Sequence, residues 1–195
     1  FNIDGSEGKM CGNAIRCVGK YMYDRRNIGK TTITVETLSG IKTLNLTVEN
    51  GEMKTAEVNM GKAVLVPKQI PVAIDGDAVI NRKVSVAGGE HDITCVSMGN
   101  PHCIVFGDDP EKIDLPTVGP KFEFDKLFPE RVNTEFIQVI DKNTLKMRVW
   151  ERGSGETLAC GTGSCAAVVA AVLNGFCEYD SPVTVKLVGG ELSIR

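Results

Sequence analysis

The sequence lacks the features that mark several large classes of protein. Its 195 residues carry a formal net charge of −3, so no excess of positive charge would attract nucleic acid or an anionic membrane. No apolar run approaches the roughly 20 residues that a helix needs to span a membrane, and no stretch resembles a secretory signal. We therefore expect neither nucleic acid nor a membrane among its partners.

Two familiar kinds of ligand site are also missing. The glycine-rich stretches Gly5–Gly8 and Gly161–Gly163 contain neither the lysine of a phosphate-binding loop nor the G-x-G-x-x-G spacing of a dinucleotide site. Seven cysteines are present, an odd number, and no two of them have the C-x-x-C spacing of a zinc or thiol-redox motif. We therefore expect reduced thiols in a cytoplasmic setting, and no metal site.

What the sequence does contain is ordinary for a globular protein. Hydrophobic residues make up 42% and charged residues 24%, and the length allows one large domain or two small ones. The strand pattern is interrupted between residues 61 and 67, so we place a boundary there, with one domain at 1–60 and a second at 61–195. The sequence opens at Phe1 without methionine and ends in a strand-like segment, so we expect it to be a piece of a longer chain.

One short pattern occurs twice, 149 residues apart. Cys160 stands in a glycine-rich turn before an apolar run, and Cys11 stands in a similar turn before a helix-like run. A glutamate lies four residues before each cysteine, Glu7 before the first and Glu156 before the second. We interpret the pattern as two copies of one device, consisting of a turn, a cysteine and a helix.

The chemistry of such a device is specific. Glycines at a helix start leave backbone N–H groups without partners, and the helix dipole there favours negative charge. A cysteine at that point is expected to have its pKa pulled below the usual value of about 8.5, which makes the thiolate accessible near neutral pH. The same N–H groups can hold the carboxylate of a ligand. Two such helix ends suggest two thiols that approach one substrate from opposite sides.

The pattern of apolar residues predicts an α+β protein. After Asn13, apolar residues at 14, 18, 21 and 22 share one face of a helix that ends at 27–29. The helix after Cys160 is apolar all round, so it must be enclosed, and Asn174-Gly175 is a good C-cap. We therefore expect strands wrapped around a central helix, twice over. The predicted strands are 31–37, 41–48, 57–60, 70–74, 79–86, 93–98, 103–106, 136–140, 145–150, 183–188 and 191–194, with one or two short helices between 110 and 128.

Several polar side chains are candidates for a site between the two cysteines. Asn100 and His102 fall in a turn that the intervening proline makes rigid, and Asn133 adds a second amide. Glu151-Arg152 places a carboxylate beside a guanidinium, a pair suited to an α-amino and α-carboxylate group. Each of these residues also has a purely structural interpretation. An asparagine side chain in a turn often forms the hydrogen bond that a backbone group would form, and a single histidine often only joins neighbouring segments by hydrogen bonds.

Other residues of reactive type are expected to be structural. Glu7 and Glu156 are interpreted as turn or capping groups. A buried cysteine is usually a small inert hydrophobe. We assign that role to Cys17, Cys95, Cys103, Cys165 and Cys177.

These motifs together resemble the diaminopimelate epimerase family, enzymes of lysine and cell-wall precursor synthesis that work without pyridoxal phosphate. The matching segments span the whole sequence in the family's order, which makes the resemblance specific. They are Phe1–Glu7, Met10–Asn13, Val58–Gly61, Ser97–Cys103, Phe128–Asn133, Glu151–Thr157 and Ala159–Gly163. The family's opening segment and closing strand have no counterpart in the sequence.

The resemblance implies a fold and an activity. The fold would have two pseudo-symmetric domains, each with β-strands around a central helix, and a site in the cleft between them. The activity would be epimerisation of L,L-diaminopimelate to the meso form in lysine biosynthesis, by two cysteines and without a cofactor. The complete enzyme would be a cytoplasmic homodimer with a small-molecule substrate.

The resemblance also assigns the site residues. The two acid/base groups would be Cys11 and Cys160, one as thiolate while the other is thiol. The carboxylate at the reacting carbon would be bound at the helix ends by Gly12, Asn13, Gly161 and Thr162. The distal end of the substrate would be held by Asn2, Asn100, Asn133, Glu151 and Arg152. The cysteine pKa values would be tuned by His102 and Glu151.

Two other functions stay open at this point. Proline racemases and hydroxyproline epimerases of the same fold also use paired cysteines, although they typically lack the Asn-Pro-His and Glu-Arg-Gly-Ser-Gly-Glu-Thr arrangements found here. The chain could also be catalytically silent and act only as a binding or assembly module.

Overall fold

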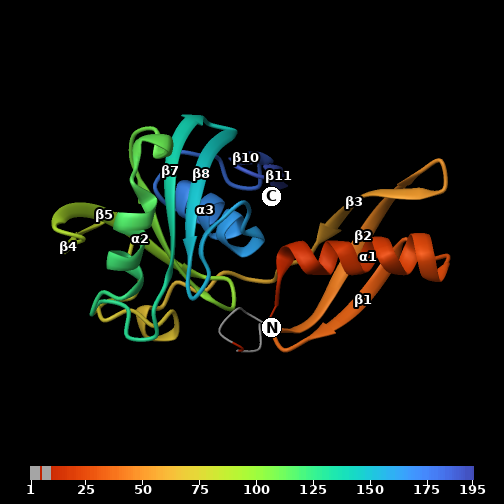
Figure 1. Ribbon diagram of the computed structural model, residues 1–195, viewed down its shortest axis with the longest axis horizontal. Coiled ribbons are helices and arrows are strands. Elements are labelled where there is room, and N and C mark those ends of the chain that lie inside the picture. Colours follow the sequence, from red (N-terminus) through yellow and green to blue (C-terminus); the bar gives the residue numbers. More distant parts are fainter. Residues whose placement is uncertain (1–4, 6–9) are drawn as a thin grey trace. The chain divides into compact units, whose positions relative to one another are not determined.

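The computed structural model of the protein describes residue 5 and residues 10–195. The chain divides into two compact units, unit 1 (Phe1–Gly61) and unit 2 (Lys62–Arg195) (Figure 1). Each unit has a hydrophobic core of its own. Across the described part of the chain, no helix combines the length and the apolar character needed to cross a membrane.

Unit 1 consists of one helix packed on a three-stranded antiparallel sheet (Figure 1). The helix is α1 (Gly12–Arg26). The strands β1 (Thr32–Thr37), β2 (Gly40–Glu49) and β3 (Glu52–Val58) pair in the order β1-β2-β3. The third strand starts earlier than the predicted residue 57, because it pairs with β2 directly from the turn onwards.

The ends of these elements follow from local sequence signals. Helix α1 ends where Asn27 takes the left-handed conformation (φ 49°), as the sequence predicts. The β2–β3 turn contains Asn50 (φ 53°) and Gly51 (φ 80°), both in the left-handed region that a tight hairpin requires. Asparagine and glycine are the residues that adopt this region most readily, so the sequence alone places this hairpin.

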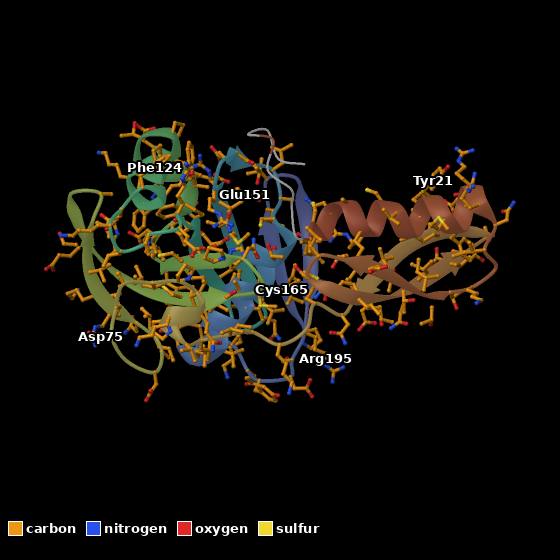
Figure 2. All side chains as sticks on the ribbon, turned by 90° about the horizontal axis from the view of Figure 1, so that it is seen from below. Tyr21, Asp75, Phe124, Glu151, Cys165 and Arg195 are labelled. Atoms are coloured by element: carbon orange, nitrogen blue, oxygen red, sulfur yellow. The ribbon has the colours of Figure 1, made fainter. Side chains whose placement is uncertain are left out.

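The buried face of α1 differs from the predicted one. Ile15 and Gly19 are buried, whereas Val18 and Tyr21, predicted to share the buried face, are 42% and 54% exposed. A Cβ built at Gly19 would lie only 3.0 Å from Leu44 Cδ2 of β2, so the helix lies close to the sheet at a residue that has no side chain. Tyr21 projects from the opposite side of α1 (Figure 2).

Unit 2 is built on an eight-stranded mixed sheet with the order β11-β10-β8-β7-β6-β5-β4, and β9 pairs with β8 (Figure 1). The β6–β7 and β8–β10 pairs are parallel and the others are antiparallel. The strands are β4 (Arg82–Val86), β5 (Gly89–Ser97), β6 (Pro101–Phe106), β7 (Asn133–Asp141), β8 (Thr144–Glu151), β9 (Gly155–Thr157), β10 (Val183–Leu187) and β11 (Gly190–Ile194). The helices are α2 (Leu115–Glu123), α3 (Gly161–Leu173) and the short 3₁₀ helices η1 (Pro67–Gln69) and η2 (Pro110–Lys112).

Helix α3 lies against one face of this sheet and is buried along most of its length. It packs in one cluster with Val96 of β5, Ile104 of β6 and Ile137 of β7. The helix ends at the predicted Asn174 cap. The prediction of an apolar helix enclosed by strands is therefore confirmed in unit 2.

The other face of the sheet is covered by α2 and by the segment 67–81. Cys103 of β6 and Phe136 of β7 belong to the core on this side. Because successive side chains of a strand point to opposite faces, their neighbours His102 and Glu135 point to the α3 side. The strand period thus brings two ionisable side chains to the face that carries α3.

The segment before β4 differs from its prediction. Alternating apolar residues predict strands at 70–74 and 79–86, but only Arg82–Val86 forms one. Ile70, Val72 and Val79 are nevertheless buried in the core beneath α2. The alternation of apolar residues therefore indicated buried side chains in a segment without regular secondary structure. Prolines at 67 and 71 have no backbone N–H group, which a strand would need for pairing.

Candidate active site

The two cysteines have the same backbone conformation. Cys11 is the N-cap of α1 with φ −128° and ψ 113°, and Cys160 is the N-cap of α3 with φ −127° and ψ 110°. The duplicated pattern thus folds twice into the same arrangement, an extended cysteine followed directly by a helix. Within their own units the thiols differ in exposure, since Cys11 is exposed and Cys160 is only 4% exposed.

The Cys160 sulfur lies against the first turn of α3. Its Sγ accepts a hydrogen bond from the backbone N–H of Gly163 at 3.3 Å and lies 3.5 Å from Thr162 Oγ1. A Cβ at Gly163 would lie 3.1 Å from this sulfur and 2.5 Å from Glu135 Oε1, so the position requires glycine. The helix end therefore supplies a backbone donor and a hydroxyl to the thiol.

Burial affects the pKa of the Cys160 thiol more than the start of helix α3 does. Burial raises the pKa of the thiol well above its usual range, and the charge of Glu151, together with that of Glu135 when it is ionised, raises the pKa further. The hydrogen bonds from Thr162 and Gly163 lower the pKa without offsetting the burial. The predicted lowering of the pKa is therefore wrong for Cys160, because the sequence shows the helix end but not what surrounds it.

A buried acid–base pair lies on the same side of the sheet. His102 Nδ1 is 2.7 Å from Glu135 Oε1, and both side chains are 0% exposed. Burial raises the pKa of the Glu135 carboxyl, although the adjacent imidazole opposes this. Glu135 was not among the predicted site residues. Its one signal in the sequence is a charged side chain at an inward-facing position, one residue before Phe136.

Asn100 connects this pair to the cysteine turn. Its Oδ1 lies 3.0 Å from His102 Nε2, and its Nδ2 donates to Thr162 Oγ1 at 3.2 Å. Four predicted site residues of unit 2 are therefore brought into one network with Glu135. They are Asn100, His102, Cys160 and Thr162.

Asn133 and Arg152 are joined to each other at the neighbouring strand ends. The backbone N–H of Arg152 donates to Asn133 Oδ1 at 2.9 Å, and Asn133 Nδ2 donates to the Pro101 carbonyl at 2.8 Å. The Arg152 guanidinium donates to the Glu130 carbonyl at 2.8 Å. Asn133 therefore links the turn at Pro101 to the end of β8.

The turn that follows Glu151 is held from two sides. Thr157 Oγ1 donates to Glu151 Oε1 at 2.5 Å. Glu123 at the end of α2 is 3% exposed, and it accepts hydrogen bonds from Trp150 Nε1 at 2.7 Å and from the Gly153 N–H at 2.9 Å. A buried carboxylate of α2 thus fixes the turn next to Glu151, and it is a second supporting residue that no sequence motif marks.

The remaining predicted residues occupy helix starts or lie outside the described residues. Asn2 is outside them. Gly12 and Asn13 form the first turn of α1, where Asn13 Oδ1 accepts a hydrogen bond from Arg16 Nη2 at 2.9 Å. Gly161 is buried in the first turn of α3.

Most of the residues that were predicted to have a structural role are buried, as that role requires. Cys17 is exposed on α1, so its assignment as a buried hydrophobe is wrong. Glu156 lies in strand β9 and forms an ion pair with Arg148 at 2.8 Å, so its assignment as a turn or capping group is wrong. Glu7 lies outside the described residues. The four other cysteines assigned this role are buried, namely Cys95, Cys103, Cys165 and Cys177.

Several proteins resemble this chain over its whole length. The model of the family described as diaminopimelate epimerase matches residues 1–66 and 94–195. A diaminopimelate epimerase of Acetivibrio thermocellus is 55% identical over 195 residues, which are 100% of this chain and 69% of that protein. One of Methanococcus maripaludis is 51% identical over 195 residues, again 100% of this chain and 70% of that protein.

Solved structures resemble the fold. A probable proline racemase from Agrobacterium radiobacter matches with a TM-score of 0.68 at 14% identity, over 95% of this chain and 58% of that chain. A hydroxyproline epimerase from Agrobacterium vitis matches with a TM-score of 0.70 at 13% identity, over 95% and 58% respectively. These two likenesses confirm the predicted fold class, and the sequence relatives show the family. The chain belongs to the diaminopimelate epimerase family, a family of isomerases.

Proposed function

We propose that the protein epimerises L,L-diaminopimelate to the meso form, as a step of lysine biosynthesis in the cytoplasm. The observation that carries this proposal is the 55% identity over the whole chain to a relative named diaminopimelate epimerase. The repeated cysteine N-cap supports it, because both reactive side chains occur at equivalent helix starts. A homodimer is part of the same proposal, and light scattering on the purified protein is its test.

The proposed reaction inverts one α-carbon by two-base catalysis, without pyridoxal phosphate. One of the thiols Cys11 and Cys160 removes the α-proton as thiolate, and the other returns a proton to the opposite face as thiol. An α-carbanion without an iminium cofactor needs its charge taken up by the adjacent carboxylate. Backbone N–H groups at Gly12-Asn13 and Gly161-Thr162 are the proposed donors to that carboxylate, and one such donor contributes about 2.7–4 kcal/mol in other enzymes.

The enclosure of Cys160 supports a division of roles before substrate binds. Its raised pKa keeps this thiol protonated at neutral pH, so Cys160 is the proposed proton donor for the first turnover. Cys11 is then the proposed base. For the reverse stereoisomer the roles exchange, as microscopic reversibility requires.

The distal amino-acid end is the proposed basis of substrate choice. Asn2, Asn100, Asn133, Glu151 and Arg152 are proposed to bind its amino and carboxylate groups. A guanidinium beside a carboxylate suits such a zwitterion. The fixed geometry of the turn after Glu151 supports this, because a turn held by Glu123 positions its donors before the substrate arrives.

The test is solvent exchange at the α-carbon. The purified protein is incubated with L,L-diaminopimelate in D₂O, and deuterium at the α-carbon is followed by mass spectrometry, with L-proline as the control substrate. Deuterium in diaminopimelate alone is the expected result. Exchange into proline alone would instead indicate a proline racemase, and no exchange into either would indicate a binding or assembly module.

A further inference from the structure

Glu135 is a buried ionisable residue that the proposed mechanism does not use. It lies on β7 with its side chain 0% exposed, beside His102 of β6. Its Oε1 is 2.7 Å from His102 Nδ1. Its Oε2 is also buried, and among the described residues it has no hydrogen-bond partner. A carboxylate in such a place would leave half of its charge without a donor, which is costly in an apolar interior.

The hydrogen bonds that lead away from Glu135 indicate which atoms donate between His102 Nε2 and Thr162. Asn100 Nδ2 donates to Thr162 Oγ1, so Asn100 Oδ1 is the atom that faces His102 Nε2. An amide oxygen only accepts, and therefore Nε2 carries a hydrogen. The Thr162 hydroxyl lies 3.5 Å from Cys160 Sγ, and either atom can donate while the sulfur is a thiol. Toward a Cys160 thiolate, which carries no hydrogen, the hydroxyl can only donate.

The remaining choice concerns His102 Nδ1. If Nδ1 also carried a hydrogen, the ring would be a cation facing a carboxylate whose second oxygen is orphaned. If Nδ1 is bare, Glu135 must carry the proton and donate it to the ring. The second arrangement leaves no buried charge, and an orphaned carbonyl-type oxygen is less costly than an orphaned anionic one. It also agrees with the burial that raises the pKa of Glu135.

We propose that Glu135 is a neutral carboxylic acid at the head of an unbroken chain of hydrogen-bond donors, which runs through His102, Asn100 and Thr162 and ends on Cys160 Sγ. Glu135 is then a positioning residue: it holds the His102 tautomer that keeps the chain directed at the sulfur. With the Gly163 N–H, the chain gives a Cys160 thiolate two donors. The catalytic use of this thiolate rests on the function proposed above.

The charged groups around this chain explain why a neutral acid is needed. Glu151 also acts on Cys160, and its charge already raises the thiol pKa. Cys103 on β6 is a further titratable neighbour of Glu135, and it is protonated at neutral pH because burial raises its pKa. A second negative charge on Glu135 would oppose the thiolate that the donors stabilise. A neutral Glu135 supplies the donor without that opposition.

The first test uses the unaltered protein. The sequence has two histidines, so ¹⁵N spectra of the imidazole nitrogens contain few signals, and a His91→Gln variant assigns them. We expect the His102 ring to carry hydrogen on Nε2 and none on Nδ1. An imidazolium, or a ring with hydrogen on Nδ1, would overturn the proposal.

The second test replaces Glu135. Glu135→Gln keeps a donor, because the amide N–H replaces the carboxyl O–H, whereas Glu135→Leu removes it at similar volume. The readout is the rate at which iodoacetamide alkylates Cys160 at pH 8.5, measured by peptide mass spectrometry with exposed Cys17 as internal reference. We expect Leu to slow the alkylation of Cys160 by about three- to tenfold and Gln to change it by less than about twofold.

Controls separate this role from a general loss of structure. Glu178→Leu, a matched change at an exposed site of unit 2, should leave both rates as they are. Equal slowing in the Gln and Leu variants would show that a donor at position 135 does not maintain the rate, and would refute the neutral acid. If Glu135→Leu does not fold, the tautomer measurement and the Gln variant decide.

Neither test uses a substrate. A protein that does not epimerise diaminopimelate can therefore still show the His102 tautomer and the Cys160 rates, and a failure of the proposed function is distinguishable from a failure of this inference. If the protein does epimerise diaminopimelate, Glu135→Leu should shift the alkaline limb of the plot of kcat against pH to higher pH. Glu135→Gln should leave that limb where it is.

Discussion

At the scale of single residues, the surroundings of a side chain decide its chemistry. Cys11 and Cys160 have nearly identical φ and ψ angles and a following glycine, yet one is exposed and the other is buried. In Cys160 the burial and the charge of Glu151 outweigh the two hydrogen bonds from α3. The helix end stabilises the thiolate once it forms, while the enclosure keeps the thiol protonated until then.

Replacement of Cys160 is the sharpest test of the proposed mechanism. Cys160→Ala removes one of the two acid/base groups, so we expect epimerisation to fall by about 10²- to 10⁴-fold or below detection. The measurement is the rate of meso-diaminopimelate formation from the L,L isomer. Cys17→Ala, at an exposed cysteine of α1, is the control and should keep the parent rate. A Cys160→Ala protein with normal activity would rule out the two-base scheme.

The buried thiols also predict how stability depends on pH. Burial raises the pKa of Cys103 well above its usual range, whereas in the unfolded chain a thiol loses its proton near pH 8.5. Above that pH the folded state binds more protons than the unfolded state, so the free energy of unfolding falls as pH rises, by up to about 1.4 kcal/mol per unit for each such thiol. Urea unfolding between pH 8 and 10 measures the slope.

A Cys103→Ala variant isolates this thiol. The variant should be less stable at pH 7, because a buried sulfur is replaced by a smaller group. Its stability should nevertheless fall less steeply above pH 8.5 than that of the parent. Parallel slopes in the two proteins would show that Cys103 is not the source of the effect.

At the scale of elements, glycines set how closely helices approach sheets. Gly19 of α1 meets Leu44 of β2, and Gly119 of α2 meets the indole of Trp150 on β8. A Cβ built at Gly119 would overlap the indole ring. The contact matters for the site, because Trp150 Nε1 donates to Glu123 of the same helix, which in turn holds the turn after Glu151.

Gly119→Ala tests this contact. The added methyl group forces the indole or α2 to move, so we expect a loss of about 1–3 kcal/mol in the free energy of unfolding. We also expect a higher KM for diaminopimelate, since the turn next to Glu151 loses its support. Gly107→Ala is the matched control, because a Cβ at Gly107 meets nothing within 4 Å. Equal stability of the two variants would contradict the packing argument.

At the scale of the whole molecule, the two units have cores of very different size. Among the described residues, the buried core of unit 1 has four members, while unit 2 has two clusters of fifteen and thirteen. Unit 1 also carries exposed apolar side chains on α1 and β2, including Tyr21 and Ile41. A small core contributes less of the hydrophobic stabilisation that opposes chain entropy.

Hydrogen exchange measures this difference directly. We expect backbone amides of β2 and β3 to exchange at least about tenfold faster than those of β6, β7 and β8, because the smaller core opens at lower free energy. Mass spectrometry of peptides after exchange in D₂O resolves the two sets. Equal protection in both units would show that they unfold as a single cooperative body.

Several features depended only on residues close together in the sequence. The Asn50-Gly51 hairpin, the Asn174 cap and the β7–β8 hairpin appear where the sequence predicts them. The repeated cysteine and helix have the same backbone angles in both copies. These are local preferences of the backbone, and the motifs that indicate the family are equally local, so neither needed the tertiary structure.

Other features were decided by contacts between distant segments. Glu135 meets His102 because parallel pairing of β6 and β7 brings together residues 33 apart in the sequence. The raised pKa of Cys160 comes from the segments that bury it and from the charge of Glu151, which the pattern of its turn does not reveal. The buried face of α1 is formed by Ile15 and Gly19 rather than by the predicted Val18 and Tyr21. The sequence alone thus determined the backbone turns and the family. The fold determined which side chains are buried away from water, because burial depends on every segment that packs nearby.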